Sequence, residues 1–178
     1  EELYQYNTKI SVPLAVSNKG YGILFDAYSL SRWGNPEPYK QLGEIFDLEM
    51  TGTYYRKEIS QRASLGRNDI LVQKEDSLYY ENEWAIRNLP EGPFSKVVYE
   101  GTITPKESGK YYFTQYYAGF QTTEIGGKEV MSRRWRPAWN PNSYKYSVEL
   151  EKGVKTPIKV VWEPDGDVSY IGLRVAPL

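Results

Sequence analysis

The strongest binding chemistry in this chain lies in residues 133–144, RRWRPAWNPNSY, which gather two tryptophans, three arginines and two asparagines among prolines. Indole rings stack on the apolar faces of sugars, and guanidinium and amide groups hydrogen-bond to hydroxyls. We therefore predict a glycan-facing loop between two strands. Its candidate contact residues are Trp135, Arg136, Trp139, Asn140 and Tyr144. Two alternatives stay open: the tryptophans plug a barrel end or pack the loop down, or they are buried against domains outside this chain.

A second group with possible chemistry is the aspartate pair Asp165 and Asp167 in the sequence PDGD. Two carboxylates at this spacing could both bind a hard cation. Pro-Asp-Gly-Asp is also a strong turn former, because aspartate side chains bond to nearby amides and glycine adopts positive φ. We favour the turn and predict no metal and no cofactor.

Composition excludes several classes of function. The 178 residues include no cysteine and no histidine, so disulfides, thiolate or imidazole zinc sites and Ser-His-Asp catalysis are impossible. With 22 Lys+Arg against 23 Asp+Glu, the formal charge of −1 argues against a nucleic-acid or anionic-membrane partner. No apolar run reaches the roughly 18 residues of a membrane span, and the start lacks a signal-peptide pattern. Paired-carboxylate chemistry such as glycoside hydrolysis is not excluded.

The elements that position these residues are predicted to be strands. Aromatic residues make up 15% of the chain and favour pleated surfaces, while 15 glycines and 11 prolines supply turns. Apolar runs flank turn sequences at residues 17–20, 105–109, 126–127, 151–153 and 164–167. This repeated hairpin pattern predicts an all-β fold, an antiparallel sandwich or barrel. Residues 59–89 are harder to interpret and are expected to hold one or two short strands and a turn of helix.

Alternation within these strands predicts which side chains are buried. Ile158, Val160 and Trp162 share one face, so Trp162 is expected in the core, as is Trp84. The doubled tyrosines at 111–112 and 116–117 must point to opposite faces, so half of them are expected to be buried.

Two parts of the chain resemble known families. Residues 50–177 resemble the PA-fourteen module, the β-barrel of protective antigen, through TGTYY, FSKVVYEGTIT, PKESGKYYF, IGGK and the pattern VELEKGxKxPIKVxW. The first 45 residues resemble the β-sandwich segment that precedes the catalytic barrel of glycoside hydrolase family 31. The matching positions there are Asn7-Thr8, Ile10, Val12-Pro13, Ser17, residues 19–22, Phe25-Asp26 and Tyr28-Ser29. The resemblance divides the chain into residues 1–45 and 46–178.

The resemblance implies a fragment of an α-xylosidase-like or α-glucosidase-like enzyme in which the module is inserted after the sandwich segment. The family's catalytic aspartates lie on a (β/α)8 barrel, and its Trp-x-Asp-Met motif is absent here, so this chain alone is expected to be non-catalytic. Its partners would be a carbohydrate and the missing catalytic domain. Trp33, beside Arg32, would face that domain and contact substrate, unless it is packed structurally. A periplasmic, cell-surface or secreted bacterial location is likewise implied.

Some lectin-like PA-fourteen modules bind sugar through Ca²⁺ held by adjacent aspartates. The resemblance places the pair within residues 116–120, at Ala118-Gly119 or, with a one-residue gap, at Tyr117-Ala118, and neither placement offers a carboxylate. We therefore expect an accessory module that shapes the substrate pocket without Ca²⁺. The alternatives are an independent carbohydrate-binding or adhesin module, and a structural spacer or dimerisation domain.

Overall fold

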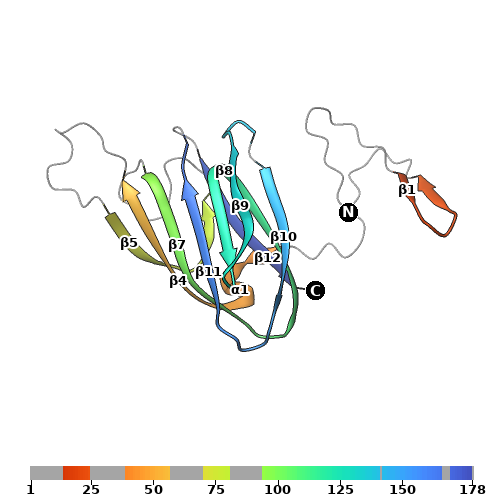
Figure 1. Ribbon diagram of the computed structural model, residues 1–178, viewed down its shortest axis with the longest axis horizontal. Helices are drawn as coiled ribbons and strands as arrows, with labels where there is room; N and C mark the ends of the chain where they lie inside the picture. The colour runs from red at the N-terminus through yellow and green to blue at the C-terminus, as the bar shows by residue number, and fades with distance from the viewer. Residues whose placement is uncertain are drawn as a thin grey trace. The chain divides into compact units, whose positions relative to one another are not determined.

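The computed structural model describes residues 14–24, 39–56, 70–80, 94–140, 142–165 and 169–177. The chain divides into two units, Glu1–Pro36 and Glu37–Leu178, which are described separately (Figure 1). Trp33, Trp84 and Asp167 lie outside the described residues, so the predictions for these three side chains stay predictions.

The described part of the first unit is a β-hairpin. Strands β1 (Leu14–Val16) and β2 (Gly22–Leu24) pair antiparallel, with Leu14 opposite Leu24. The Ser17 amide donates to the Tyr21 carbonyl at 2.8 Å, and Gly20 has a φ of 85°. The hairpin predicted around residues 17–20 is thus confirmed over residues 14–24.

The described residues of the second unit lie mostly in strands, as predicted. Its elements in chain order are β3 (Lys40–Gln41), α1 (Leu42–Ile45), β4 (Phe46–Arg56), β5 (Ile70–Glu75), β6 (Leu78–Tyr80), β7 (Phe94–Pro105), β8 (Gly109–Ile125), β9 (Lys128–Arg136), β10 (Asn142–Leu150), β11 (Thr156–Glu163) and β12 (Tyr170–Pro177). Strands β5 and β6 match the short strands expected within residues 59–89. Among the described residues no helix has the length and apolarity required to cross a membrane.

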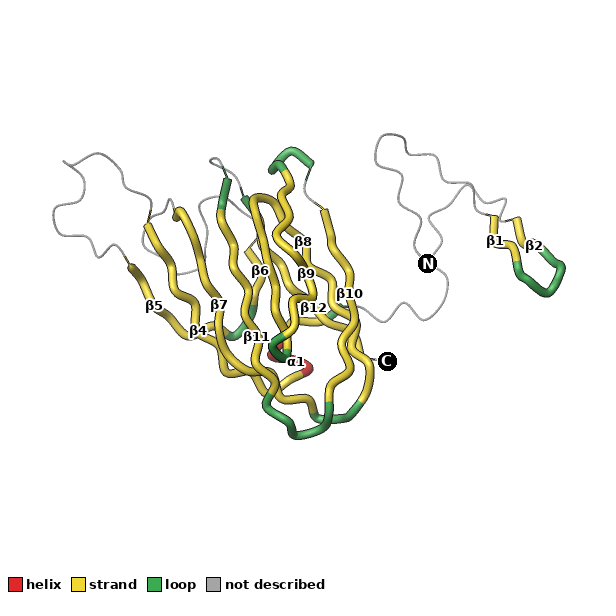
Figure 2. The backbone as a smooth tube through the Cα atoms, in the orientation of Figure 1, coloured by secondary structure: helices red, strands yellow, loops and turns green. Residues whose placement is uncertain are grey.

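These strands form two antiparallel layers that share the long strand β8 (Figures 1 and 2). The first half of β8 pairs with β10 and β12, and β12 also pairs with β3 and β6; we call this the β12 layer. The second half of β8 pairs with β9 and β11, followed by β7, β4 and β5; we call this the β11 layer. The change of layer falls near Gly119, whose φ is +87°. Residues 116–120, expected as a loop, are therefore strand residues in the middle of β8.

The core lies between the two layers and is rich in aromatic rings. Phe46 of β4 packs against Phe113 of β8 with 6.2 Å between ring centroids, which joins the layers. Trp162 is 3% exposed, and Ile158 and Val160 are buried beside it, as alternation predicted. Tyr111 and Tyr117 are buried while Tyr112 and Tyr116 are exposed, which confirms the prediction for the doubled tyrosines.

The two ends of the second unit lie on neighbouring strands. Lys40 of β3 is the register partner of Val175 of β12, and Leu42 of α1 is fully buried in the core. Residues 40–45 thus pack with the second unit. The division into family segments 1–45 and 46–178 stays a prediction.

Candidate functional site

The structure distributes the predicted contact residues over three places. Trp135 and Arg136 end strand β9, Trp139 and Asn140 lie in the turn that follows, and Tyr144 lies in β10. The predicted loop is therefore shorter than expected, because residues 133–136 and 142–144 belong to strands.

Trp139 projects from a tight turn. The Asn140 amide donates to the Pro137 carbonyl at 3.1 Å, which closes the turn after β9. The Trp139 side chain is 85% exposed. The alternative that Trp139 plugs the barrel end or packs its loop down is therefore wrong within the described residues, whereas contact with a ligand or with another domain stays open.

Trp135 is held on the outer face of the β11 layer. Its indole N–H donates to Oδ2 of Asp165 at 2.6 Å, and its ring lies 6.3 Å from that of Phe120 at an interplanar angle of 42°. The side chain is still 48% exposed. Trp135 is thus a restrained aromatic ring that keeps about half of its surface in solvent.

A charged pair lies against the neighbouring Phe120 ring. Nε of Arg133 lies 2.9 Å from Oε2 of Glu163, and the Arg133 guanidinium carbon lies 3.9 Å from the Phe120 ring centroid. Both charged side chains remain partly exposed. We name Arg133, Trp135, Phe120, Glu163 and Asp165 the Trp135 cluster; it offers an aromatic ring, one guanidinium and two carboxylates.

Strand register explains why sequence analysis did not assemble this cluster. The turn at Gly126 and Gly127 begins the β8–β9 hairpin with Ile125 opposite Lys128, and simple counting would place Phe120 opposite Arg133. Two register shifts on the way place Phe120 opposite Trp135 instead. Bulges of this kind leave no clear sequence signal.

Asp165 and Glu163 were also missed as neighbours of Trp135. The sequence PDGD predicts only a turn at Asp165, and alternation places Glu163 only on the strand face opposite Trp162. Glu163 is the register partner of Phe120, so β8 lies between Glu163 and Trp135. The available signal was the alternation in β11, which points Glu163 outward; the pairing of β11 with β8 could not be deduced from it.

Tyr144 belongs to a different contact. The Arg134 guanidinium carbon lies 4.4 Å from the Tyr144 ring centroid, and the Tyr144 ring lies 6.1 Å from that of Tyr146. A cation over an aromatic face is a stabilising contact. Arg134 and Tyr144 therefore join β9 to β10, and one face of the Tyr144 ring is occupied within the chain.

The inner face beneath the Trp135 cluster is fixed by a second tryptophan. The Trp162 indole N–H lies 3.1 Å from the Ala118 carbonyl and 3.2 Å from the Ser169 hydroxyl, and that hydroxyl donates to the same carbonyl. A Cβ on Gly119 would meet the Glu163 carbonyl at 2.7 Å. This close approach of backbones requires glycine and holds β8 against the end of β11.

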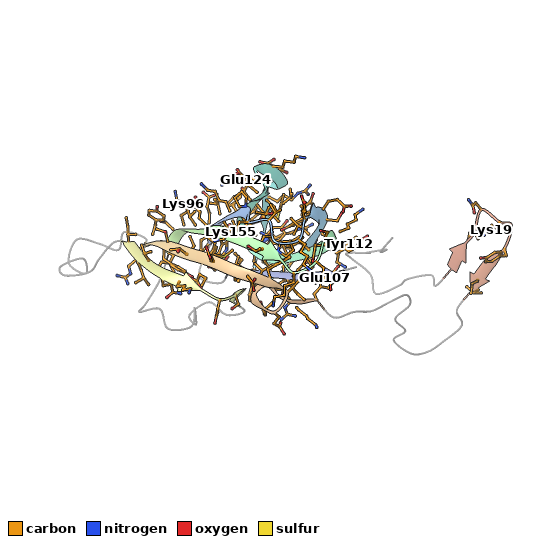
Figure 3. All side chains as sticks on the ribbon, turned by 90° about the horizontal axis from the view of Figure 1, so that it is seen from below. Lys19, Lys96, Glu107, Tyr112, Glu124 and Lys155 are labelled. Carbon is orange, nitrogen blue, oxygen red and sulfur yellow. The ribbon has the colours of Figure 1, made fainter. Side chains whose placement is uncertain are left out.

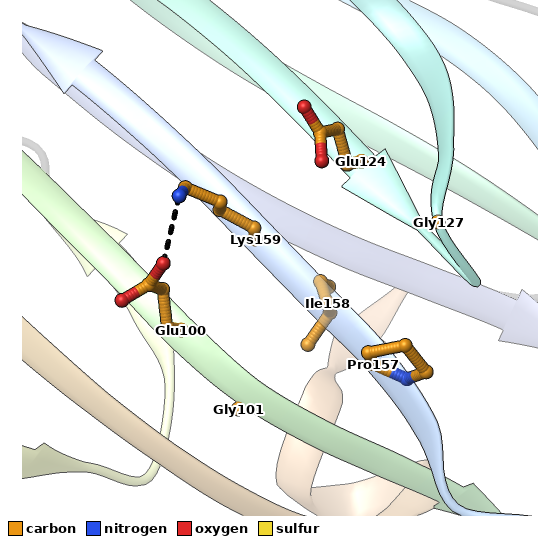
Figure 4. A pocket seen from close by; sticks show the side chains of 7 residues that line it. All are labelled: Glu100, Gly101, Glu124, Gly127, Pro157, Ile158 and Lys159. Atoms are coloured by element: carbon orange, nitrogen blue, oxygen red, sulfur yellow. Dashed lines mark ion pairs between the residues drawn. The ribbon is translucent and has the colours of Figure 1, made fainter.

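A depression on the same outer face is the other candidate site. Lys159 lies between Glu100 of β7 and Glu124 of β8, with its Nζ 2.8 Å from Oε1 of Glu100 (Figure 4). The hydrogen bond to Glu100 raises the pKa of Lys159. Figure 3 shows Lys96 and Glu124 projecting from this side of the ribbon. All these charges are exposed, so the depression is a solvated ion-pair surface and has no reactive group held away from water.

A metal centre finds no support in the described part of the chain, where no group of three acidic side chains could hold an ion. Ala118 and Gly119, one of the two placements that the sequence resemblance implies for an aspartate pair, are buried strand residues without carboxylates.

Solved structures of other proteins are similar to this chain. No family model matches the chain. An α-xylosidase of glycoside hydrolase family 31 from Xanthomonas citri is similar over 98% of this chain, with a TM-score of 0.75 and 26% identity. The chain spans only 19% of that enzyme's length.

Isolated domains of the same fold are also similar. The PA14 domain of the antifreeze protein MpAFP matches 83% of this chain and 88% of its own length, with a TM-score of 0.50 and 11% identity. The A domain of epithelial adhesin 9 from Candida glabrata, in complex with Galβ1-4GlcNAc, matches 82% and 89%, with a TM-score of 0.51 and 13% identity. The chain therefore resembles a PA14-type module within a family 31 glycoside hydrolase, as the sequence predicted.

Proposed function

We propose that this chain is a non-catalytic accessory module of a bacterial family 31 α-glycosidase, an α-xylosidase or α-glucosidase, and that it contacts the carbohydrate beside the catalytic pocket. The observation that carries the proposal is the similarity over 98% of the chain to a family 31 α-xylosidase. That similarity takes in both units of this chain in one alignment. Residence in the periplasm or at the cell surface, where polysaccharide is degraded, is part of the proposal.

The ends of the second unit support an inserted module. Because Lys40 and Val175 are partners on adjacent strands, the chain enters and leaves this unit at the same place. A compact unit with neighbouring ends can be added to a host domain without separating the host's own strands.

The role of such a module is binding, since the family's Trp-x-Asp-Met motif is absent from this sequence. Trp139 and Trp135 present exposed indole surface near the end of β9, where sugar rings could stack. Binding of remote parts of a substrate lowers the reaction barrier when that binding is realised in the transition state. A branched oligosaccharide would bind more strongly through these contacts, whereas a small aryl glycoside would be too short to reach them.

The test is excision of the module from the full-length gene product. Residues 40–175 are replaced by a short Gly-Ser linker, which the adjacency of β3 and β12 permits. We expect kcat/KM for an α-xylosyl-branched oligosaccharide to fall at least about tenfold, the equivalent of one or two lost contacts, while kcat/KM for an aryl α-xyloside changes less than about twofold. An equal loss on both substrates would contradict the proposal.

An independent carbohydrate-binding or adhesin module is the second candidate. The observation that favours it is the fold similarity to an adhesin domain in complex with a disaccharide. It predicts that the isolated chain binds glycans tightly and that excision leaves both hydrolysis rates unchanged. A spacer or dimerisation domain predicts unchanged rates and no glycan binding by the isolated chain.

A further inference from the structure

We infer that the Trp135 cluster is a subsite for one neutral pyranose ring, separate from the turn that carries Trp139. The inference rests on the proposed function and adds to it a location, a ligand class and the residues that orient the ring.

The stacking surface of this subsite is fixed in advance. The carboxylate of Asp165 binds the indole N–H of Trp135, the tilted Phe120 ring supports one side, and the β8–β9 register fixes the backbone. About half of the indole remains in solvent. A ring that is already immobilised loses little side-chain freedom when a ligand stacks on it, so more of the contact energy appears as affinity.

Polar groups beside the Trp135 and Phe120 rings match the hydroxyls of a sugar. Arg133 supplies hydrogen-bond donors, and Glu163 and Asp165 supply acceptors. Each sugar hydroxyl can both donate and accept, so neighbouring hydroxyls can bind the guanidinium and a carboxylate together. The ion pair of Arg133 with Glu163 holds these two side chains in place before the ligand arrives.

Charge selects a neutral sugar over an acidic one. The Trp135 cluster carries one guanidinium and two carboxylates. Lys96, on the neighbouring strand β7, is directed to the Tyr55 ring, with its Nζ 4.8 Å from the ring centroid. Within the cluster, a uronate or sulfated sugar would meet two carboxylates and one guanidinium that is already paired with Glu163, and Arg134, the next residue on β9, is directed to the Tyr144 ring. A xylose or glucose unit carries no charge for these carboxylates to repel.

The position of Trp135 distinguishes this surface from the Trp139 turn. Trp135 lies near the end of the edge strand β9, opposite Phe120, and its partners come from β8, from the end of β11 and from Asp165 just beyond it. Trp139 lies in the turn after β9, and among the described contacts none joins it to the Trp135 cluster. A sugar bound at Trp135 therefore need not involve Trp139.

The experiment follows the indole N–H signals of the 178-residue chain by ¹H–¹⁵N NMR, with the Trp135 signal assigned by W135F. The probes are an α-xylosyl-branched cello-oligosaccharide and an oligogalacturonide of similar length. We expect the branched neutral probe to shift the Trp135 signal saturably and the oligogalacturonide to leave it in place. D165A should weaken binding of the neutral probe at least about fivefold, because the indole loses the hydrogen bond that orients it. D165N should weaken this binding less, because its amide oxygen can still accept the hydrogen bond from the indole N–H.

The matched control is Y112A, an exposed aromatic residue in the first half of β8, which should leave the Kd at Trp135 within about twofold. The inference is overturned if the probe moves other indole signals but not that of Trp135, if no indole signal moves, or if the oligogalacturonide binds as tightly as the neutral probe. Each of these results can occur while excision of the module from the full-length protein still lowers hydrolysis of long substrates, so failure of the subsite and failure of the proposed function are separable.

Discussion

Two tryptophans on opposite faces of the β11 layer show how the same residue type takes different roles. Trp162 points inward, is 3% exposed and bonds its indole N–H to the Ala118 carbonyl and the Ser169 hydroxyl. Trp135 points outward, is 48% exposed and bonds its indole N–H to a carboxylate. Both indoles are oriented by a hydrogen bond, but only the inner one excludes water from its ring.

The difference indicates what each face contributes. Burial of a large ring supplies stability, because apolar surface is removed from water. An oriented ring that stays in solvent adds little stability and keeps its surface available to a ligand. We therefore expect substitutions on the inner face to change unfolding and those on the outer face to change binding.

The largest effect is expected for Trp162→Ala. Removing a buried indole leaves a cavity and deprives the Ala118 carbonyl and Ser169 of a donor, so the free energy of unfolding should fall by about 3 to 5 kcal/mol. Urea unfolding followed by circular dichroism measures this change. A loss below about 1 kcal/mol would show that Trp162 is not a core residue.

The second-largest loss of stability is expected for Gly119→Ala, at the strand position where β8 changes layer. The positive φ is unfavourable for alanine, and its Cβ would lie 2.7 Å from both the Glu163 carbonyl and the Ser169 hydroxyl. Together these should cost about 2 to 3 kcal/mol of unfolding free energy. The matched control is Gly127→Ala, which shares a positive φ but would meet no atom within 4 Å; it should cost about 1 kcal/mol, and equal losses would contradict the role of close packing at Gly119.

A smaller, pH-dependent effect is expected at Tyr146, which is partly buried against the core. Burial raises the pKa of the Tyr146 hydroxyl above its usual 10.0, and the hydroxyl hydrogen-bonds to Gln115 at 3.1 Å. Above pH 10 the unfolded chain loses this proton while the folded chain keeps it, so stability should fall as pH rises. Tyr146→Phe should flatten that fall and cost about 1 kcal/mol at neutral pH, measured as unfolding free energy between pH 8 and pH 11. An unchanged slope would contradict the assignment.

The smallest effect on stability is expected for Trp135→Ala, on the outer face. Unfolding free energy should change by about 0.5 kcal/mol or less, as for other surface substitutions. Thermal unfolding of the variant beside Tyr112→Ala, another exposed aromatic residue, checks this. A loss comparable with that of Trp162→Ala would remove the distinction between the two faces.

The fold could be predicted from the sequence more completely than the site. The strands of a hairpin are close in sequence, whereas the site joins residues that are distant in sequence. Turn sequences such as Gly126-Gly127 predict the hairpins, and alternation predicts that Trp162 lies in the core. The single long β8 was not foreseen, because its change of layer at Gly119 depends on contacts with β11 and β12.

The site could not be predicted in full for the same reason, because its residues come from strands that are distant in sequence. Residue types alone drew attention to Trp135 and Trp139, and both proved to be exposed. The partners of Trp135 lie 15 and 30 positions away in the chain, at Phe120 and Asp165, and two bulges set the register with Phe120. No pattern within one strand carries that information.

The central claim is that this scaffold adds carbohydrate contacts to a separate catalytic domain. Its most direct test is the kcat/KM of the full-length gene product that carries Trp135→Ala and Trp139→Ala together. The account predicts a fall of about tenfold or more for an α-xylosyl-branched oligosaccharide, no change beyond about twofold for an aryl α-xyloside, and no effect of Tyr112→Ala on either substrate. Unchanged kinetics on the branched substrate, with the double variant folded, would contradict it.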